Sequence, residues 1–228
     1  MMTEENSITL SFPETIVLLA LNDKGWFGSS EQRIKFGLAG ALLFELEKAG
    51  EIEIRDNRIR ITGIRETGDR VMDSAIEVLR KSKKKLSLKN AIQRIVYKSG
   101  LKWRTLLKNL VKKNILKKEE YHLFGIFHQD KYPIVNIELK KHLQENLYSK
   151  LMGEHELSDK EMMLLSIMKT CRMIDKNFHL QEHFLKVRLK VREITEFKEP
   201  LTENKRKIKE IQEAVRRSII SSNVNLHI

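Results

Sequence analysis

The stretch FGLAGALLFELEKAGEIEIRDNRIRIT, residues 36–62, joins a helix to a β-hairpin, and this plan recurs later in the chain. Its first half continues a helix that starts after the sequence SSEQ and is expected to end at Gly50. Its second half alternates isoleucine with charged residues on both sides of Asp56 and Asn57, a pair that favours a tight turn. The stretch therefore predicts a helix followed directly by a short hairpin.

Helix signals dominate the rest of the chain. Ser11 is an expected N-cap, because Pro13 lies in the first turn and Glu14 follows three residues on. Gly37 and Gly40 lie one helical turn apart, which indicates the close approach of another backbone. Further helices are predicted over residues 70–82, 88–98, 101–113, 137–152, 159–174, 178–196 and 203–220. The expected fold is mainly α, with two short β-hairpins.

Length and composition limit the class of protein. At 228 residues and 41% hydrophobic, the chain can bury a sizeable core, and we expect a single multi-helical globular domain over 8–222. A flexible N-terminus (1–7) and a C-terminal tail (223–228) are expected on either side. No apolar run approaches the roughly 20 residues of a membrane span, and the first residues lack the pattern of a signal peptide. The single cysteine, Cys171, excludes an internal disulfide and is expected to be a buried thiol in a cytoplasmic protein.

One segment carries the whole excess of positive charge. The net charge is +12, yet the segment from Arg80 to Lys118 alone contains 15 Lys and Arg residues and no Asp or Glu, so the rest of the chain sums to −3. A basic block without compensating acid indicates a polyanionic partner, either nucleic acid or an anionic membrane surface.

The basic segment contains two predicted helices. In the second, Arg104, Lys108 and Lys112 recur every four residues on one face, apart from an apolar stripe that is expected to face the core. In the first, Arg94 and Lys98 lie one turn apart on the outer face. If the two helices pack as an antiparallel pair, their basic rows line one groove that suits phosphate groups.

The second hairpin is expected directly after this segment. Its apolar residues Leu123, Phe124, Ile126 and Phe127 hardly alternate with polar ones. Such a segment is buried on both sides, pairs with a second subunit, or inserts shallowly into an anionic bilayer.

Nucleic acid remains the alternative partner. The stretch LLKNLVKKNILKKEEYHLFGIF, residues 106–127, repeats the helix-then-hairpin plan of residues 36–62. Helix followed by hairpin is also the layout of a winged helix, whose recognition helix enters the major groove of DNA. A winged-helix-like nucleic-acid-binding protein is therefore the second hypothesis.

Catalytic motifs are scarce. The sequence HLQEH, residues 179–183, matches H-x-x-E-H, and on a continuous helix His179 and His183 would face one side and could hold zinc. The alternative is two partly exposed histidines without a metal. The sequence contains no P-loop, no dinucleotide-binding glycine motif, no nucleophile elbow and no C-x-x-C pair. We therefore predict a protein that is not an enzyme and has no cofactor.

Three blocks resemble the Golgi phosphoprotein 3 family, in particular its shorter, prokaryotic-type members. The blocks are ITLSFPETIVLLALNDKGWF (8–27), FGLAGALLFELEKAGEIEI (36–54) and LLKNLVKKNILKKEEYHLFGIFHQDKYPIVN (106–136). The resemblance implies a mainly helical fold with β-hairpins. It also implies a peripheral membrane protein or adaptor, because eukaryotic members bind phosphatidylinositol 4-phosphate at the Golgi and the cytosolic tails of glycosyltransferases.

The family's lipid pocket carries over in part. Its tryptophan aligns with Ser30, one arginine with Ala39, and an arginine pair with Gly100 and Trp103, so these side chains differ here. The residues expected to bind lipid phosphate instead are Arg33, Lys102, Arg104 and Lys108. The resemblance thus implies affinity for anionic phospholipid, with phosphoinositide as one such lipid.

The family's apolar hairpin corresponds to residues 117–132. The resemblance implies that this hairpin contacts the membrane or a second copy of the chain. The side chains expected to do so are Leu123, Phe124, Ile126 and Phe127.

Overall fold

The computed structural model describes residues 8–27, 29–63, 67–82, 86–99, 103–123, 127–153, 156–179 and 182–224. The first helices are α1 (Phe12–Ala20), α2 (Glu31–Lys48), α3 (Arg70–Arg80), α4 (Leu88–Lys98) and α5 (Trp103–Lys112). The later helices are α6 (Ile137–Met152), α7 (Asp159–Thr170), α8 (Ile174–Phe178), α9 (Phe184–Glu196) and α10 (Glu203–Val224). The strands are β1 (Ile52–Arg55), β2 (Arg58–Ile61), β3 (Leu86–Ser87), β4 (Glu119–Leu123) and β5 (Phe127–Lys131).

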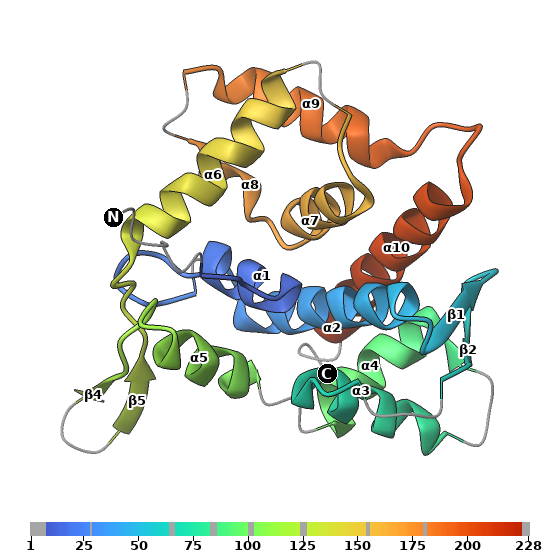
Figure 1. Ribbon diagram of the computed structural model, residues 1–228, viewed down its shortest axis with the longest axis horizontal. Coiled ribbons are helices and arrows are strands. Elements are labelled where there is room, and N and C mark those ends of the chain that lie inside the picture. The colour runs from blue at the N-terminus through green and yellow to red at the C-terminus, as the bar shows by residue number, and fades with distance from the viewer. Residues whose placement is uncertain are drawn as a thin grey trace, which may run out of the picture.

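Helix α2 is the centre of the molecule (Figure 1). It packs against α1, α3, α4, α7 and α10, and its buried side chains extend from Ile34 to Leu46. Figure 1 shows α6 to α9 above α2, and α3, α4 and α5 below it. The two hairpins lie at opposite ends of the molecule, and one buried apolar cluster extends from Phe12 to Ile219. The expectation of a mainly α fold with two hairpins is confirmed.

The predicted capping box at the start of α1 is present. The Glu14 amide donates to Ser11 Oγ at 3.3 Å, and the Glu14 carboxylate accepts from the Ser11 amide at 2.8 Å. The same carboxylate accepts from Lys113 Nζ, directly after α5, at 2.7 Å. Glu14 is buried, so this pair fixes α1 against the end of α5.

The two glycines of α2 allow close packing, but against side chains rather than another backbone. A Cβ atom on Gly37 would lie 2.7 Å from Cys171 Sγ, and one on Gly40 would lie 2.6 Å from Val215 Cγ2. Both distances are too short for real atoms, so α2 approaches the end of α7 and α10 only because these positions lack side chains.

The first hairpin has the predicted register and turn. Ile52 pairs with Ile61, and Asp56 and Asn57 form the turn with φ angles of 50° and 58°. Positive φ at both positions is the signature of a type I′ turn. The short strand β3 extends this sheet by pairing with β2.

The structure corrects two helix boundaries near the C-terminus. The helix predicted over 159–174 ends at Thr170, and Arg172 adopts a left-handed φ of 58°. The helix predicted over 178–196 is replaced by the separate helices α8 and α9. Helix α10 continues to Val224 and so includes the first two residues of the tail expected at 223–228. Residues 1–7 and 225–228 lie outside the described residues.

Candidate functional site

The candidate site lies at the N-terminus of α2. A helix of 18 residues presents unpaired N–H groups and a positive dipole end at its first turn. Among the described residues, Ser30 at the N-cap forms no side-chain hydrogen bond to this turn. The end of the helix is therefore suited to an anion.

Aromatic and basic side chains join α5 to this end of α2. Trp103, the first residue of α5, packs edge-to-face on Phe27 with ring centroids 5.2 Å apart. Lys35 Nζ lies 5.5 Å from the Trp103 ring centroid and 2.6 Å from Glu31 Oε1. The Trp103 ring is half-buried and packs against the apolar cluster.

Helix α4 also contacts the first turns of α2. The Gln32 side-chain amide donates to Tyr97 Oη at 3.1 Å, and the Tyr97 ring lies edge-to-face on Phe36 at 6.0 Å. Tyr97 is nonetheless 59% exposed, so it forms part of the surface around the helix terminus.

The turn that follows α7 is the third segment that contacts the N-terminus of α2, after α5 and α4. Ser29 Oγ donates to the Arg172 carbonyl at 3.1 Å, and the Cys171 thiol donates to the Arg33 carbonyl at 3.2 Å. Arg33 is half-buried, and Cys171 is a fully buried thiol, as expected. Burial raises the pKa of Cys171 to about 12, and the nearby positive charge of Arg33 opposes this shift.

Helix α5 carries an exposed basic row beside this end of α2. Arg104, Lys108 and Lys112 are exposed on one face, while Leu107 and Leu110 are buried on the other. Among the described residues, no carboxylate forms an ion pair with any of the three cations. The row can therefore bind an external anion without breaking an ion pair to any described residue.

Other cations of the basic segment are neutralised inside the protein. Lys118 forms an ion pair with Asp130 at 3.0 Å, and this contact raises the pKa of Lys118. The same hydrogen bond lowers the pKa of Asp130, to which the charge of Arg104 contributes less. Lys113 forms an ion pair with Glu14. The excess of charge in the sequence thus overstates the number of cations that are available to a ligand.

The residues predicted to bind phosphate lie in different parts of the structure, and one of them is not described. Arg33 lies in the first turn of α2, and Arg104 and Lys108 lie in the exposed row of α5. Lys102 lies outside the described residues. Ala39, which aligns with a family arginine, is fully buried in the core and is not part of a surface site.

The apolar hairpin is present as backbone. Leu123 pairs with Phe127 at the end of β4–β5, and Phe124 and Ile126 lie outside the described residues. Membrane contact or self-association through these four residues stays a prediction.

Two arrangements that the sequence analysis considered are not found in the described residues. Helices α4 and α5 are not an antiparallel pair in the described chain, because α4 packs on α10, α2 and α3 while α5 packs on α1. The residues His179 and His183 end α8 and precede α9, so they do not share one helix face. The described residues contain no cluster of three or more His, Cys, Asp or Glu side chains arranged for a metal.

Sequence reasoning missed Lys35, Tyr97 and Arg172. Lys35 and Tyr97 are next in sequence to residues that the helical pattern predicts to be in the core. The sequence alone therefore did not indicate that their side chains form part of a surface site. Arg172 lies 143 residues after Ser29, its hydrogen-bond partner, and no local pattern predicts such proximity.

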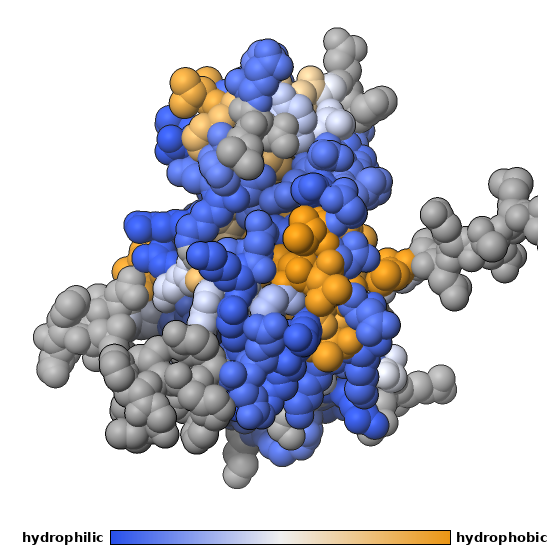
Figure 2. Space-filling view, turned by 90° about the vertical axis from the view of Figure 1, so that its left-hand side faces the viewer, coloured by the Kyte–Doolittle hydropathy of each residue, from blue (hydrophilic) through white to orange (hydrophobic). Residues whose placement is uncertain are grey.

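The end of the molecule that carries α5 and β4–β5 is largely hydrophilic, with a prominent apolar patch near the middle of the view and smaller apolar areas near its top and left edge (Figure 2). Exposed apolar residues of segments at this end are Ile8, Val135 and Ile137. No described helix is both long enough and apolar enough to cross a bilayer.

Together, these features define a mainly helical protein with a cationic surface around one helix terminus. The family model of Golgi phosphoprotein 3 (GPP34) matches residues 12–219, and the chain belongs to this family. The chain is also similar to the vacuolar protein sorting-associated protein 74 of Eremothecium gossypii, with 25% identity over 169 residues. That alignment covers 63% of this chain and 50% of the relative, so the chain spans about half the length of the relative that it matches.

Proposed function

We propose that the chain is a non-enzymatic peripheral membrane protein that binds anionic phospholipid or phosphoinositide headgroups. The binding surface is the N-terminus of α2 together with Arg33, Lys35, Arg104 and Lys108. The observation that carries the proposal is the exposed row of α5 cations, for which the described residues provide no ion-pair partner. The first residue of α5, Trp103, contacts Lys35 in the first turns of α2, whose N-terminus has no side-chain cap.

The summed binding free energy of these cations is sufficient for reversible membrane binding. Each Lys or Arg near an anionic membrane surface contributes about 1 kcal/mol. Arg33, Arg104 and Lys108 give roughly 3 kcal/mol, since Lys35 is already paired with Glu31. The helix dipole and shallow apolar contacts add to this sum. Family membership supports the same class of function, with the apolar hairpin at 117–132 as a second membrane contact or as an interface between copies. Cytosolic tails of membrane proteins are the corresponding class of protein partner.

The test is co-sedimentation with vesicles of three compositions. These are phosphatidylcholine alone, phosphatidylcholine with phosphatidylserine, and phosphatidylcholine with phosphatidylinositol 4-phosphate. We expect pelleting with both anionic compositions and none with the neutral one. Stronger pelleting with the phosphoinositide at equal surface charge would indicate recognition of that headgroup.

The variant Arg104→Glu/Lys108→Glu should lose most of this pelleting. A matched control is Arg55→Glu/Arg58→Glu, which changes the net charge equally at the tip of the β1–β2 hairpin, at the opposite end of the molecule from β4–β5. Equal losses in both variants would mean that net charge, rather than the α5 surface, drives binding. Unchanged pelleting of the folded α5 variant would refute the proposal.

Nucleic acid is the alternative occupant of the same surface, since α5 is followed directly by the β4–β5 hairpin. Binding to DNA through this row would appear as a mobility shift that weakens steeply with salt, with a logarithmic slope of about −0.9 per phosphate contacted. A shift at low salt without any vesicle binding would favour this alternative.

A further inference from the structure

Helix α9 begins with an unusual pattern. The sequence FLKVRLKVR, residues 184–192, alternates apolar and basic residues and contains no acid. In a strand this alternation would give a single apolar face. In a helix, residues four apart share a face, so the alternation produces two apolar rows on opposite sides.

The two rows have opposite environments. Val187 and Val191 are 0% and 2% exposed and pack in the core. Leu185 and Leu189 are 71% and 65% exposed. Two leucines one turn apart, with nothing in the described chain to cover them, form an apolar surface that needs an external partner.

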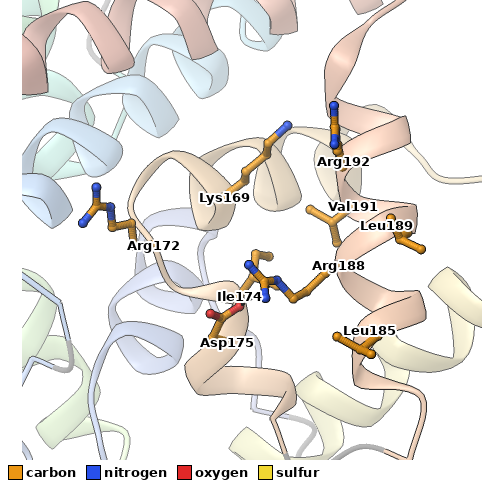
Figure 3. Close-up of a pocket in the computed structure, with 9 residues that line it drawn as sticks. All are labelled: Lys169, Arg172, Ile174, Asp175, Leu185, Arg188, Leu189, Val191 and Arg192. Carbon is orange, nitrogen blue, oxygen red and sulfur yellow. Dashed lines mark ion pairs between the residues drawn. The ribbon is translucent and has the colours of Figure 1, made fainter.

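Basic residues surround the exposed leucines. A groove of about 700 Å³ lies between α9 and the α7–α8 turn (Figure 3). Its cations are Lys169, Arg172, Arg188 and Arg192. Asp175 is its acidic residue and lies 3.6 Å from Arg188, while Arg192 is paired with Glu196 at 2.6 Å outside the groove. The groove therefore has an excess of positive charge.

Arg172 connects the groove to the candidate lipid site. Arg172 lines the groove and accepts, through its carbonyl, the hydrogen bond from Ser29 beside the N-terminus of α2. Figure 3 shows the Arg172 side chain directed away from Arg188 and Leu185. One arginine thus lies at the border between the two surfaces.

We propose that α9 is a second membrane contact, in which Leu185 and Leu189 insert into an anionic bilayer while the cations of the groove contact lipid phosphates. This inference rests on the proposed function. A bilayer fits this groove because its two lining leucines are 71% and 65% exposed. The basic side chains that line it with them match the charge of anionic headgroups. Apolar side chains flanked by cations are the pattern of a helix that lies in the membrane interface.

The chain offers a direct probe of insertion. Cys171, the single cysteine, is 0% exposed, so a fluorophore reacts with a new cysteine at an exposed position. Leu189→Cys carries an environment-sensitive dye at the proposed contact. Glu145→Cys is the matched control, because Glu145 is exposed on α6 opposite the buried Lys140, Leu147 and Leu151. We expect a blue shift and higher intensity at position 189, and no change at 145, when phosphatidylcholine vesicles containing phosphatidylserine are added.

A second variant measures the contribution to affinity. Leu185→Ser/Leu189→Ser should weaken binding to the same vesicles by at least about tenfold, because each leucine loses its transfer into the bilayer. Its unfolding midpoint should equal that of the wild type, since both side chains are exposed.

The outcomes separate this inference from the proposed function. Wild-type pelleting with a silent dye at position 189, or with an unaffected double-serine variant, would overturn the α9 contact and leave the proposed function intact; the leucines would then belong to a protein partner. Absence of wild-type pelleting on anionic vesicles would overturn both.

Discussion

Lys35 Nζ on α2 lies 5.5 Å from the centroid of the Trp103 ring, the first side chain of α5. Trp103 also contacts Phe27, whose ring packs edge-to-face on it. The loop before α2, the first turns of α2 and the start of α5 are therefore joined by one aromatic residue. The cations of α5 keep a fixed place beside the α2 terminus because of this contact.

Replacement of Trp103 should weaken the packing of the start of α5 against α2 and the loop before it. Trp103→Ala loses a cation–π contact of about 0.5–1 kcal/mol, an aromatic pair of similar size and part of its apolar burial. We expect the free energy of unfolding to fall by about 2–3 kcal/mol in urea denaturation, with weaker vesicle binding by the folded protein. Trp103→Phe keeps a ring and should lose about half as much. An equal loss in the two variants would contradict this account.

In the ion pair between Glu14 and Lys113, replacing Glu14 should lower the free energy of unfolding more than replacing Lys113. Glu14→Ala removes the capping box and leaves Lys113 without its carboxylate, so we expect a loss of about 2–4 kcal/mol in the free energy of unfolding. Lys113→Met should cost less, about 1–2 kcal/mol, because Glu14 still accepts from the Ser11 amide. A double-mutant cycle measured by urea denaturation gives the coupling, which should exceed about 0.5 kcal/mol for residues in contact. Additive losses would mean that the pair contributes nothing.

Local signals predicted much of the fold. The Ser11–Glu14 capping box and the Asp56–Asn57 turn are present, because each depends on side chains that are close in sequence. The break between α7 and α8 was not predictable in this way. Arg172 has no intrinsic preference for a left-handed backbone, and tertiary contacts hold it there.

The candidate site was predictable to a smaller extent. The four-residue spacing placed Arg104 and Lys108 on one face, since helical periodicity alone decides that. Which elements surround the α2 terminus depends on how distant helices pack, and the pairing of α4 with α5 was wrong for this reason. The alternating sequence FLKVRLKVR gives two apolar rows on a helix, and a helix was predicted here, but the pattern alone does not tell which row faces the core.

The contact between Gly37 and Cys171 can be tested by compensation. Gly37→Ala places a methyl group 2.7 Å from Cys171 Sγ and should destabilise the protein by about 1–3 kcal/mol. In the Cys171→Ala background the sulfur is gone, so the same change should cost clearly less. Thermal unfolding of the four proteins measures both costs. The same cost in both backgrounds would place the strain elsewhere, for example against Ile167, whose Cγ2 atom would lie 3.0 Å away.

The buried thiol also predicts a dependence of stability on alkaline pH. Burial raises the pKa of Cys171 from 9.0 to about 12, so the native thiol keeps its proton while the unfolded chain loses it above pH 9. The native state then binds more protons than the unfolded state, and the contribution of Cys171 to stability falls by about 1.4 kcal/mol per pH unit between these two pKa values. Below pH 9 this contribution is constant. The difference in free energy of unfolding between wild type and Cys171→Ala should therefore shrink from pH 8.5 to pH 10.5, while titration of Lys and Tyr affects both proteins alike. A difference that stays constant over this range would mean that the thiol ionises in the native state near its ordinary pKa, and would contradict its burial against α2.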